Sequence, residues 1–118
     1  NMKLKKVIEI IKAKPNCEQF ENLEIETACG ADLMSDVLAF SHGKTMLFTG
    51  LTNPQVIRTA EMTDIKVICF VRGKKPTSET LKLADEKGIY LFATDKPLFE
   101  VCGLLYNHGI KPEKLEKF

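Results

Sequence analysis

The sequence has no tryptophan, no excess of one charge and no long apolar run. Its longest apolar stretches are a few residues long, whereas a helix needs roughly 20 apolar residues to cross a bilayer. Lys and Arg number 17 and Asp and Glu number 16, which leaves a net charge of +1. Without a broad positive field, we expect neither nucleic acid nor a membrane surface as a partner.

Paired cysteines are also absent, because the four cysteines are scattered without a Cys-x-x-Cys pair and only two histidines accompany them. Such spacing does not fit a zinc site, and we predict neither a metal nor a cofactor. We expect Cys17, Cys29, Cys69 and Cys102 to be reduced and mostly buried, since free cysteine behaves as a small apolar residue. The chain starts with a charged amphipathic segment rather than a signal peptide, so we expect a cytoplasmic protein.

A recognisable catalytic set is missing as well, and we predict that the chain is not an enzyme. Ser35 with Asp36 is the first of two weak alternatives. The second is Cys29, if folding brings it close to His42. Asp32 and Asp36 have a spacing that suits a shared cation, but helix capping and solvation explain the same pair.

What the sequence does contain is a regular alternation of strand and helix patterns. With 118 residues and 44% hydrophobic content, the chain has the size of one domain. A first helix to about residue 13 precedes a half-exposed edge strand over 23–27, and a turn at 28–32 leads into a short helix. The strands expected after that are Thr45–Thr49, Ile65–Val71 and Ile89–Ala93, each followed by a helix that begins near Pro54, Pro76 or Pro97.

This order predicts the α/β class, as a single three-layer domain with a mainly parallel sheet. We expect it to span residues 2–110, with 111–118 as a C-terminal tail. Right-handed crossovers place every strand-to-helix turn of such a sheet at its carboxyl edge, where helix N–H groups also point. A ligand is therefore expected at that edge.

The turns at the carboxyl edge combine glycines, hydroxyls and cations, which suits a phosphate or carboxylate group. The plain alternative is a set of ordinary helix caps and solvated loops. Gly43-Lys44-Thr45 has the ending of a phosphate-binding P-loop, but Leu38 stands where the first glycine is required, so we treat it as a false match. The predicted ligand-binding residues are Gly50, Thr52, Asn53, Arg72, Lys74 and Thr94.

The last predicted helix has an apolar arc of roughly 220°, whereas packing on a core needs a stripe of about 100°. We expect the surplus to form a self-associating surface and the chain to be a homodimer. The predicted interface residues are Leu98, Val101 and Leu105. The alternative is that residues 110–118 bury this face.

The stretch Gly30-Ala31-Asp32-Leu33-Met34-Ser35-Asp36-Val37-Leu38-Ala39 resembles a stretch of DRTGG-domain proteins. Phe70-Val71-Arg72-Gly73-Lys74-Lys75-Pro76 and the Gly103-Leu104-Leu105-Tyr106 stretch continue the resemblance, which runs from about Leu4 to Ile110. The later half is also similar to the amino-terminal domain of HPr kinase/phosphorylase. The literal Asp-Arg-Thr-Gly-Gly string is absent, and Thr49-Gly50-Leu51-Thr52-Asn53 stands where relatives often carry Thr-x-x-His-Asn or Gly-Asp-Arg.

The resemblance implies an α/β fold like the HPr kinase amino-terminal domain and a dimeric or regulatory role. DRTGG domains occur alone and beside ligand-sensing CBS domains in some inorganic pyrophosphatases, and no established reaction belongs to them. We therefore expect a non-catalytic regulatory or ligand-sensing domain that binds a nucleotide or phosphorylated metabolite at the carboxyl edge. The alternative is a protein–protein interaction or scaffold module that acts through the last helix.

Overall fold

A computed structural model describes residues 1–40 and 43–113 of the chain. Within them, six strands form one sheet in the order β2-β7-β6-β5-β4-β8. Neighbours from β7 through β8 run parallel, and β2 is antiparallel to β7. The strands are β2 (Lys14–Pro15), β4 (Thr27–Gly30), β5 (Thr45–Thr49), β6 (Val67–Phe70), β7 (Tyr90–Ala93) and β8 (Lys111–Pro112).

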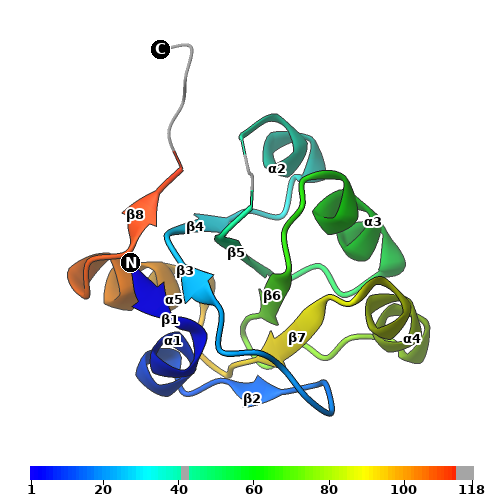
Figure 1. Ribbon diagram of the computed structural model, residues 1–118, viewed down its shortest axis with the longest axis horizontal. Coiled ribbons are helices and arrows are strands. Elements are labelled where there is room, and N and C mark those ends of the chain that lie inside the picture. Colours follow the sequence, from blue (N-terminus) through cyan, green and yellow to red (C-terminus); the bar gives the residue numbers. More distant parts are fainter. Residues whose placement is uncertain (41–42, 114–118) are drawn as a thin grey trace.

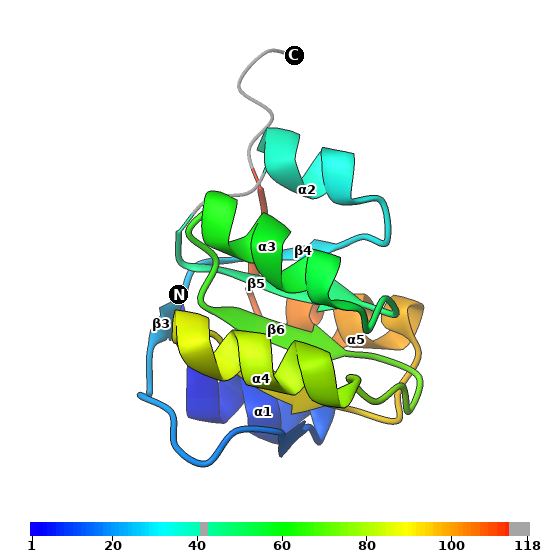
Figure 2. The ribbon, with the colours of Figure 1, turned by 90° about the vertical axis from the view of Figure 1, so that its right-hand side faces the viewer.

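Helices cover both faces of this sheet, which confirms the α/β class and the mainly parallel sheet (Figures 1 and 2). One face carries α1 and α5, and the other carries α2, α3 and α4. The helices are α1 (Leu4–Ile11), α2 (Met34–Phe40), α3 (Pro54–Met62), α4 (Ser78–Lys87) and α5 (Leu98–Asn107).

Helices α3 and α4 have the capping residues that local chemistry favours. The Asn53 side chain accepts a hydrogen bond from the Gln55 N–H at 3.0 Å, and Pro54 occupies the first turn of α3. Thr77 caps α4 by accepting from the Thr80 N–H at 3.2 Å. Gly88 ends α4 with a φ of 68°, a left-handed conformation that glycine adopts without strain.

Each central strand contributes side chains to two separate cores because successive residues of a strand point to opposite faces. Met46 and Phe48 pack with α1 and α5, whereas Leu47 packs with α2, α3 and α4. All five residues of β5 are buried. This burial on both faces explains the nearly continuous apolar sequences of β5, β6 and β7.

The structure corrects the predicted edge strand over 23–27. Two short strands replace it: β3 (Glu24–Ile25) pairs with β1 (Met2–Lys3) outside the main sheet, and β4 lies inside the sheet between β5 and β8. The predicted turn at 28–32 begins after Gly30 instead. Ala28 and Cys29 point into opposite cores, so they extend the strand rather than turn the chain.

The predicted C-terminal tail also starts too early. Lys111–Pro112 forms β8, which pairs in parallel with Thr27 and Ala28 of β4. Ile110 is buried and holds this return to the sheet in place. The folded unit therefore extends at least to residue 112, and residues 114–118 lie outside the described residues.

We expect replacement of Gly30 with valine to lower the free energy of unfolding by about 1–3 kcal/mol, the usual cost of overpacking. A Cβ atom at Gly30 would lie 2.8 Å from Cys102 Sγ and 3.0 Å from Leu98 Cδ1 of α5. Urea denaturation measures the change. Adding Cys102→Ala should restore part of the loss, and equal stability of Gly30→Val and wild type would contradict this packing.

Candidate functional site

Three strand-to-helix turns meet at the carboxyl edge of the sheet, as the parallel order requires (Figure 2, right-hand side). Hydrogen bonds tie the turns to each other. Thr80 Oγ1 donates to the Thr52 carbonyl at 2.7 Å, which joins the turn after β5 to α4. The Arg72 N–H donates to the Lys96 carbonyl at 2.9 Å, which joins the turn after β6 to the turn after β7.

Gly50 does not offer a free N–H to a ligand at this edge. Its N–H donates to Asp32 Oδ1 at 2.8 Å, and the Thr49 hydroxyl donates to the same oxygen at 2.7 Å. Asp32 reaches this position because β4 and β5 are paired and the turn after β4 follows the same edge. The carboxylate of the chain itself thus occupies the place that an external anion was expected to take.

Asn53 and Thr94 also use their side chains within the chain. The Asn53 side-chain oxygen caps α3, as described above. Thr94 is buried, and its hydroxyl donates to the Ile11 carbonyl at 2.7 Å and accepts from the Lys96 N–H at 3.3 Å. Thr94 therefore fastens the end of α1 to β7, and its side chain is not exposed to a ligand.

Of the remaining predicted residues, Thr52 lies on the turn after β5, where its carbonyl accepts from Thr80. Arg72 and Lys74 lie on the turn after β6, and together with Lys75 they make it a cationic turn. Arg72 and Gly73 have φ values of 56° and 67°, and the Lys74 N–H donates to the Val71 carbonyl at 3.1 Å. This tight turn exposes the side chains of Arg72, Lys74 and Lys75. None of the three forms an ion pair with a residue that the structure describes.

A non-glycine residue in the left-handed region costs on the order of 1 kcal/mol. At Arg72 the conformation is held by its own N–H bond to Lys96 and by the Gly73 N–H, which donates to the Thr94 carbonyl at 3.0 Å. Asp95 lies beside Gly73 and offsets part of the local positive charge. The turn is therefore fixed in place while its cationic side chains face solvent.

The predicted interface on α5 is wrong for two of its three residues. Val101 and Leu105 are 0% and 2% exposed and pack in the core with α1. Leu98 is half-buried against the same core. The wide apolar arc thus has a buried part, which packs on the core, and an exposed part. The exposed part consists of Phe99 and Tyr106 on the outer side of α5, which are 91% and 68% exposed.

None of the four cysteines, all of which lie in the described ranges, forms a disulfide, and only Cys69 among them is buried. Burial raises the pKa of the Cys69 thiol to about 12 and also raises the pKa of Cys17 and of Cys102. These three thiols keep their protons at neutral pH, which makes them poor nucleophiles. Cys29 is half-buried, and its predicted companion His42 lies outside the described residues.

The other candidate sites concern the Ser35–Asp36 pair and metal-ligating side chains. Ser35 and Asp36 lie exposed on α2. No three His, Cys, Asp or Glu side chains in residues 1–40 and 43–113 are placed to share a metal ion. Across the same ranges, no helix is long and apolar enough to span a bilayer.

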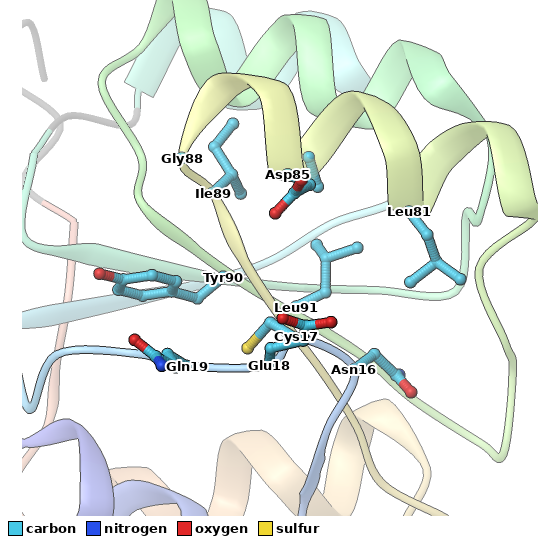
Figure 3. Close-up of a pocket in the computed structure, with 11 residues that line it drawn as sticks. Asn16, Cys17, Glu18, Gln19, Leu81, Asp85, Gly88, Ile89, Tyr90 and Leu91 are labelled. Carbon is cyan, nitrogen blue, oxygen red and sulfur yellow. The ribbon is translucent and has the colours of Figure 1, made fainter.

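Two cavities lie away from the predicted turns, and the sequence did not indicate either. The first, of about 520 Å³, is a groove between residues 16–19, β7 and α4 (Figure 3). The second, of about 490 Å³, lies where β5 and β6 begin and contains the ion pairs Lys44–Glu26 and Lys66–Asp64 at 3.7 and 3.1 Å. The walls of each come from segments far apart in the sequence, so no local motif marks them.

Comparison with known proteins gives a fold rather than a family. The chain matches no family model and no curated protein. Its structure is similar to the CBS and DRTGG domains of the regulatory region of Clostridium perfringens pyrophosphatase, crystallised with the activator diadenosine tetraphosphate. The TM-score is 0.72 at 14% identity, over 86% of this chain and 45% of the other, so this chain spans less than half of that region. This likeness supports a DRTGG-like fold, and that neighbour is a regulatory region.

We expect replacement of Thr94 with valine to lower the free energy of unfolding by about 1–3 kcal/mol, because the buried Ile11 carbonyl loses its hydrogen-bond donor. Thr94→Ser keeps the hydroxyl and serves as the matched control. Chemical denaturation of both variants measures the difference. Wild-type stability of Thr94→Val would contradict this structural role of the hydroxyl.

Proposed function

We propose that this chain is a non-catalytic regulatory domain that senses a nucleotide or a phosphorylated metabolite at the carboxyl edge of its sheet. The observation that carries this proposal is the cationic turn, which is held rigidly at that edge with no ion-pair partner in the described residues. Because the backbone of this turn is already ordered, binding an anion here has no cost for ordering the loop. The fold likeness to a regulatory region crystallised with a nucleotide activator supports the same reading.

The proposed contacts differ from the six predicted residues because some of those residues hold the turns together. Arg72 supplies a planar guanidinium that binds two phosphate oxygens at once, and Lys74 supplies a mobile ammonium. Thr52 lies on the neighbouring turn and adds a hydroxyl. Gly50 and Asn53 shape that turn through their bonds to Asp32 and Gln55 and do not touch the ligand in this proposal.

We further propose that the domain is cytoplasmic and related to the amino-terminal domain of HPr kinase/phosphorylase. Cysteines that form no disulfide are typical of a reducing compartment, which favours the cytoplasm. The strand-Arg-Gly-x-x-Pro sequence at Phe70–Pro76 supports kinship with the amino-terminal domain of HPr kinase/phosphorylase. In this proposal the domain takes no part in the phosphoryl chemistry of that enzyme, because the P-loop of HPr kinase belongs to its other domain.

We expect calorimetric titration with ATP and with sugar phosphates to find at least one ligand with a dissociation constant below about 1 mM. Arg72→Ala and Lys74→Ala should each weaken that ligand about tenfold, because each removes a charge-assisted hydrogen bond. Lys82→Ala is the matched control, since Lys82 is an exposed lysine of α4 away from the turn. Failure of every nucleotide and sugar phosphate to bind, or equal losses in Lys82→Ala, would contradict the proposal.

A protein–protein interaction module is the second candidate, and the outer side of α5 favours it. Phe99, Gly103 and Tyr106 follow each other at helical spacing and are all exposed. Glycine inside a helix costs about 1 kcal/mol relative to alanine. Apart from its two chain neighbours and the backbone of α5, no atom of the described residues lies within 4 Å of a Cβ atom built at Gly103, so packing within these residues does not explain this glycine. Close approach of a second copy would explain it, as the homodimer prediction requires.

We expect Phe99→Glu to convert a dimer into a monomer, because it replaces the most exposed apolar side chain of this helix face with a charge. Size-exclusion chromatography with light scattering measures the mass. Met62→Glu is the matched control, since Met62 is 75% exposed on α3, on the opposite face of the sheet. A wild-type chain that is monomeric at high concentration, or a Phe99→Glu variant that stays dimeric, would contradict this second candidate.

A further inference from the structure

The groove of about 520 Å³ is built by the way the chain leaves the sheet after β2 (Figure 3). Pairing of β2 with β7 ends near Asn16, whose N–H donates to the Leu91 carbonyl at 2.7 Å. Four residues later, the Phe20 ring packs edge-on against Phe92 and Tyr90, with centroid distances of 5.0 and 6.3 Å. The segment between these two anchors forms one wall of the groove, and α4 forms the other.

The groove is therefore present before any ligand binds, because both ends of the segment that forms this wall are attached to β7. Its volume lies within the range of about 300–1,000 Å³ that is common for small-molecule sites. Leu81 supplies an apolar surface along it and remains 37% exposed, whereas the other two aliphatic lining residues, Ile89 and Leu91, are buried. An apolar body that covers Leu81 would remove this exposed surface from water.

The charges at the groove all have one sign. Glu18 and Asp85 line it from opposite walls, and no lysine, arginine or histidine lines it (Figure 3). Neither carboxylate forms an ion pair with a residue in the described ranges. In the second cavity, by contrast, both Glu26 and Asp64 are neutralised by lysines.

The other polar groups of the groove add hydrogen-bond acceptors without adding a positive charge. Asn16 and Gln19 bring amide oxygens, and Tyr90 brings a phenol and the face of its ring. Burial raises the pKa of the Cys17 thiol, so this side chain is neutral and adds no charge of its own. A phosphate would meet two carboxylates here and would be repelled.

We infer that the groove between residues 16–19 and α4 binds a small organic cation with a flat apolar body, such as an aromatic amine or amidine. The cationic group lies between Glu18 and Asp85, and the flat body packs on Leu81. The site prefers the opposite charge to the cationic turn at the carboxyl edge. It goes beyond the proposed function, since the anionic ligand proposed there does not fit the groove.

Three probes of nearly the same shape test the inference on the full chain: benzamidine (a cation), benzamide (neutral) and benzoate (an anion). We expect benzamidine to cause saturable shifts in the backbone amide NMR signals of Leu81, Asp85 and Leu91. Benzamide should bind about tenfold more weakly, because it lacks the charge-assisted hydrogen bonds. Benzoate should cause no shifts in these signals.

Single substitutions locate the binding site. Asp85→Asn and Glu18→Gln should each weaken benzamidine binding about tenfold, since each removes one charge-assisted hydrogen bond. Glu86→Gln is the matched control, because Glu86 is the exposed neighbour of Asp85 on α4 and does not line the groove. Equal affinity for the three probes, equal effects of Asp85→Asn and Glu86→Gln, or benzamidine shifts confined to other surfaces would each overturn the inference. Absence of any benzamidine shift at saturating concentration would overturn it as well.

Discussion

Parallel pairing of β4, β5, β6 and β7 is the constraint from which the other features of this domain follow. Strands paired in parallel need crossover connections, and the helices in those connections cover both faces of the sheet. The alternation of Met46, Leu47 and Phe48 between two separate cores shows this directly. The same pairing brings successive turns to one edge, where their backbone groups bond to each other. A ligand site at that edge is consequently assembled from at least two turns.

At the carboxyl edge, many polar groups of the turns form hydrogen bonds within the chain, and only the others can bind a ligand. Buried polar groups require partners, so the Thr94 hydroxyl bonds to the α1 carbonyl and the Gly50 N–H bonds to Asp32. Arginine and lysine side chains are long and remain solvated, so the cationic groups of the tight turn do not need hydrogen-bond partners within the chain. The groove beside α4 follows the same principle with the other sign, because Glu18 and Asp85 stay solvated on its opposite walls. The two sites that we propose thus differ in the sign of their charge.

Helix α5 shows why an apolar arc does not by itself identify an interface. Hydrophobic periodicity counts apolar side chains without stating which neighbour covers them. The chain covers Val101 and Leu105 with α1, and Phe99 and Tyr106 are left outside. The arc is wider than the core covers, as predicted, but the predicted interface residues Val101 and Leu105 lie on the buried side of the helix. Gly103 adds information that periodicity omits, since glycine has no side chain to count.

Local sequence alone determined the α/β class, β5 as Thr45–Thr49, the caps at Asn53 and Thr77, and the end of α4 at Gly88. These features depend on near neighbours, on the period of apolar residues and on turn chemistry, and the sequence displays all of them. Only the tertiary structure decided that Ala28 and Cys29 extend a strand, that Lys111–Pro112 returns to the sheet and that Asp32 takes the Gly50 N–H. It also decided that residues 16–19 and α4 enclose a groove. These outcomes depend on contacts between distant segments, and such contacts form only when the strands have taken their order in the sheet.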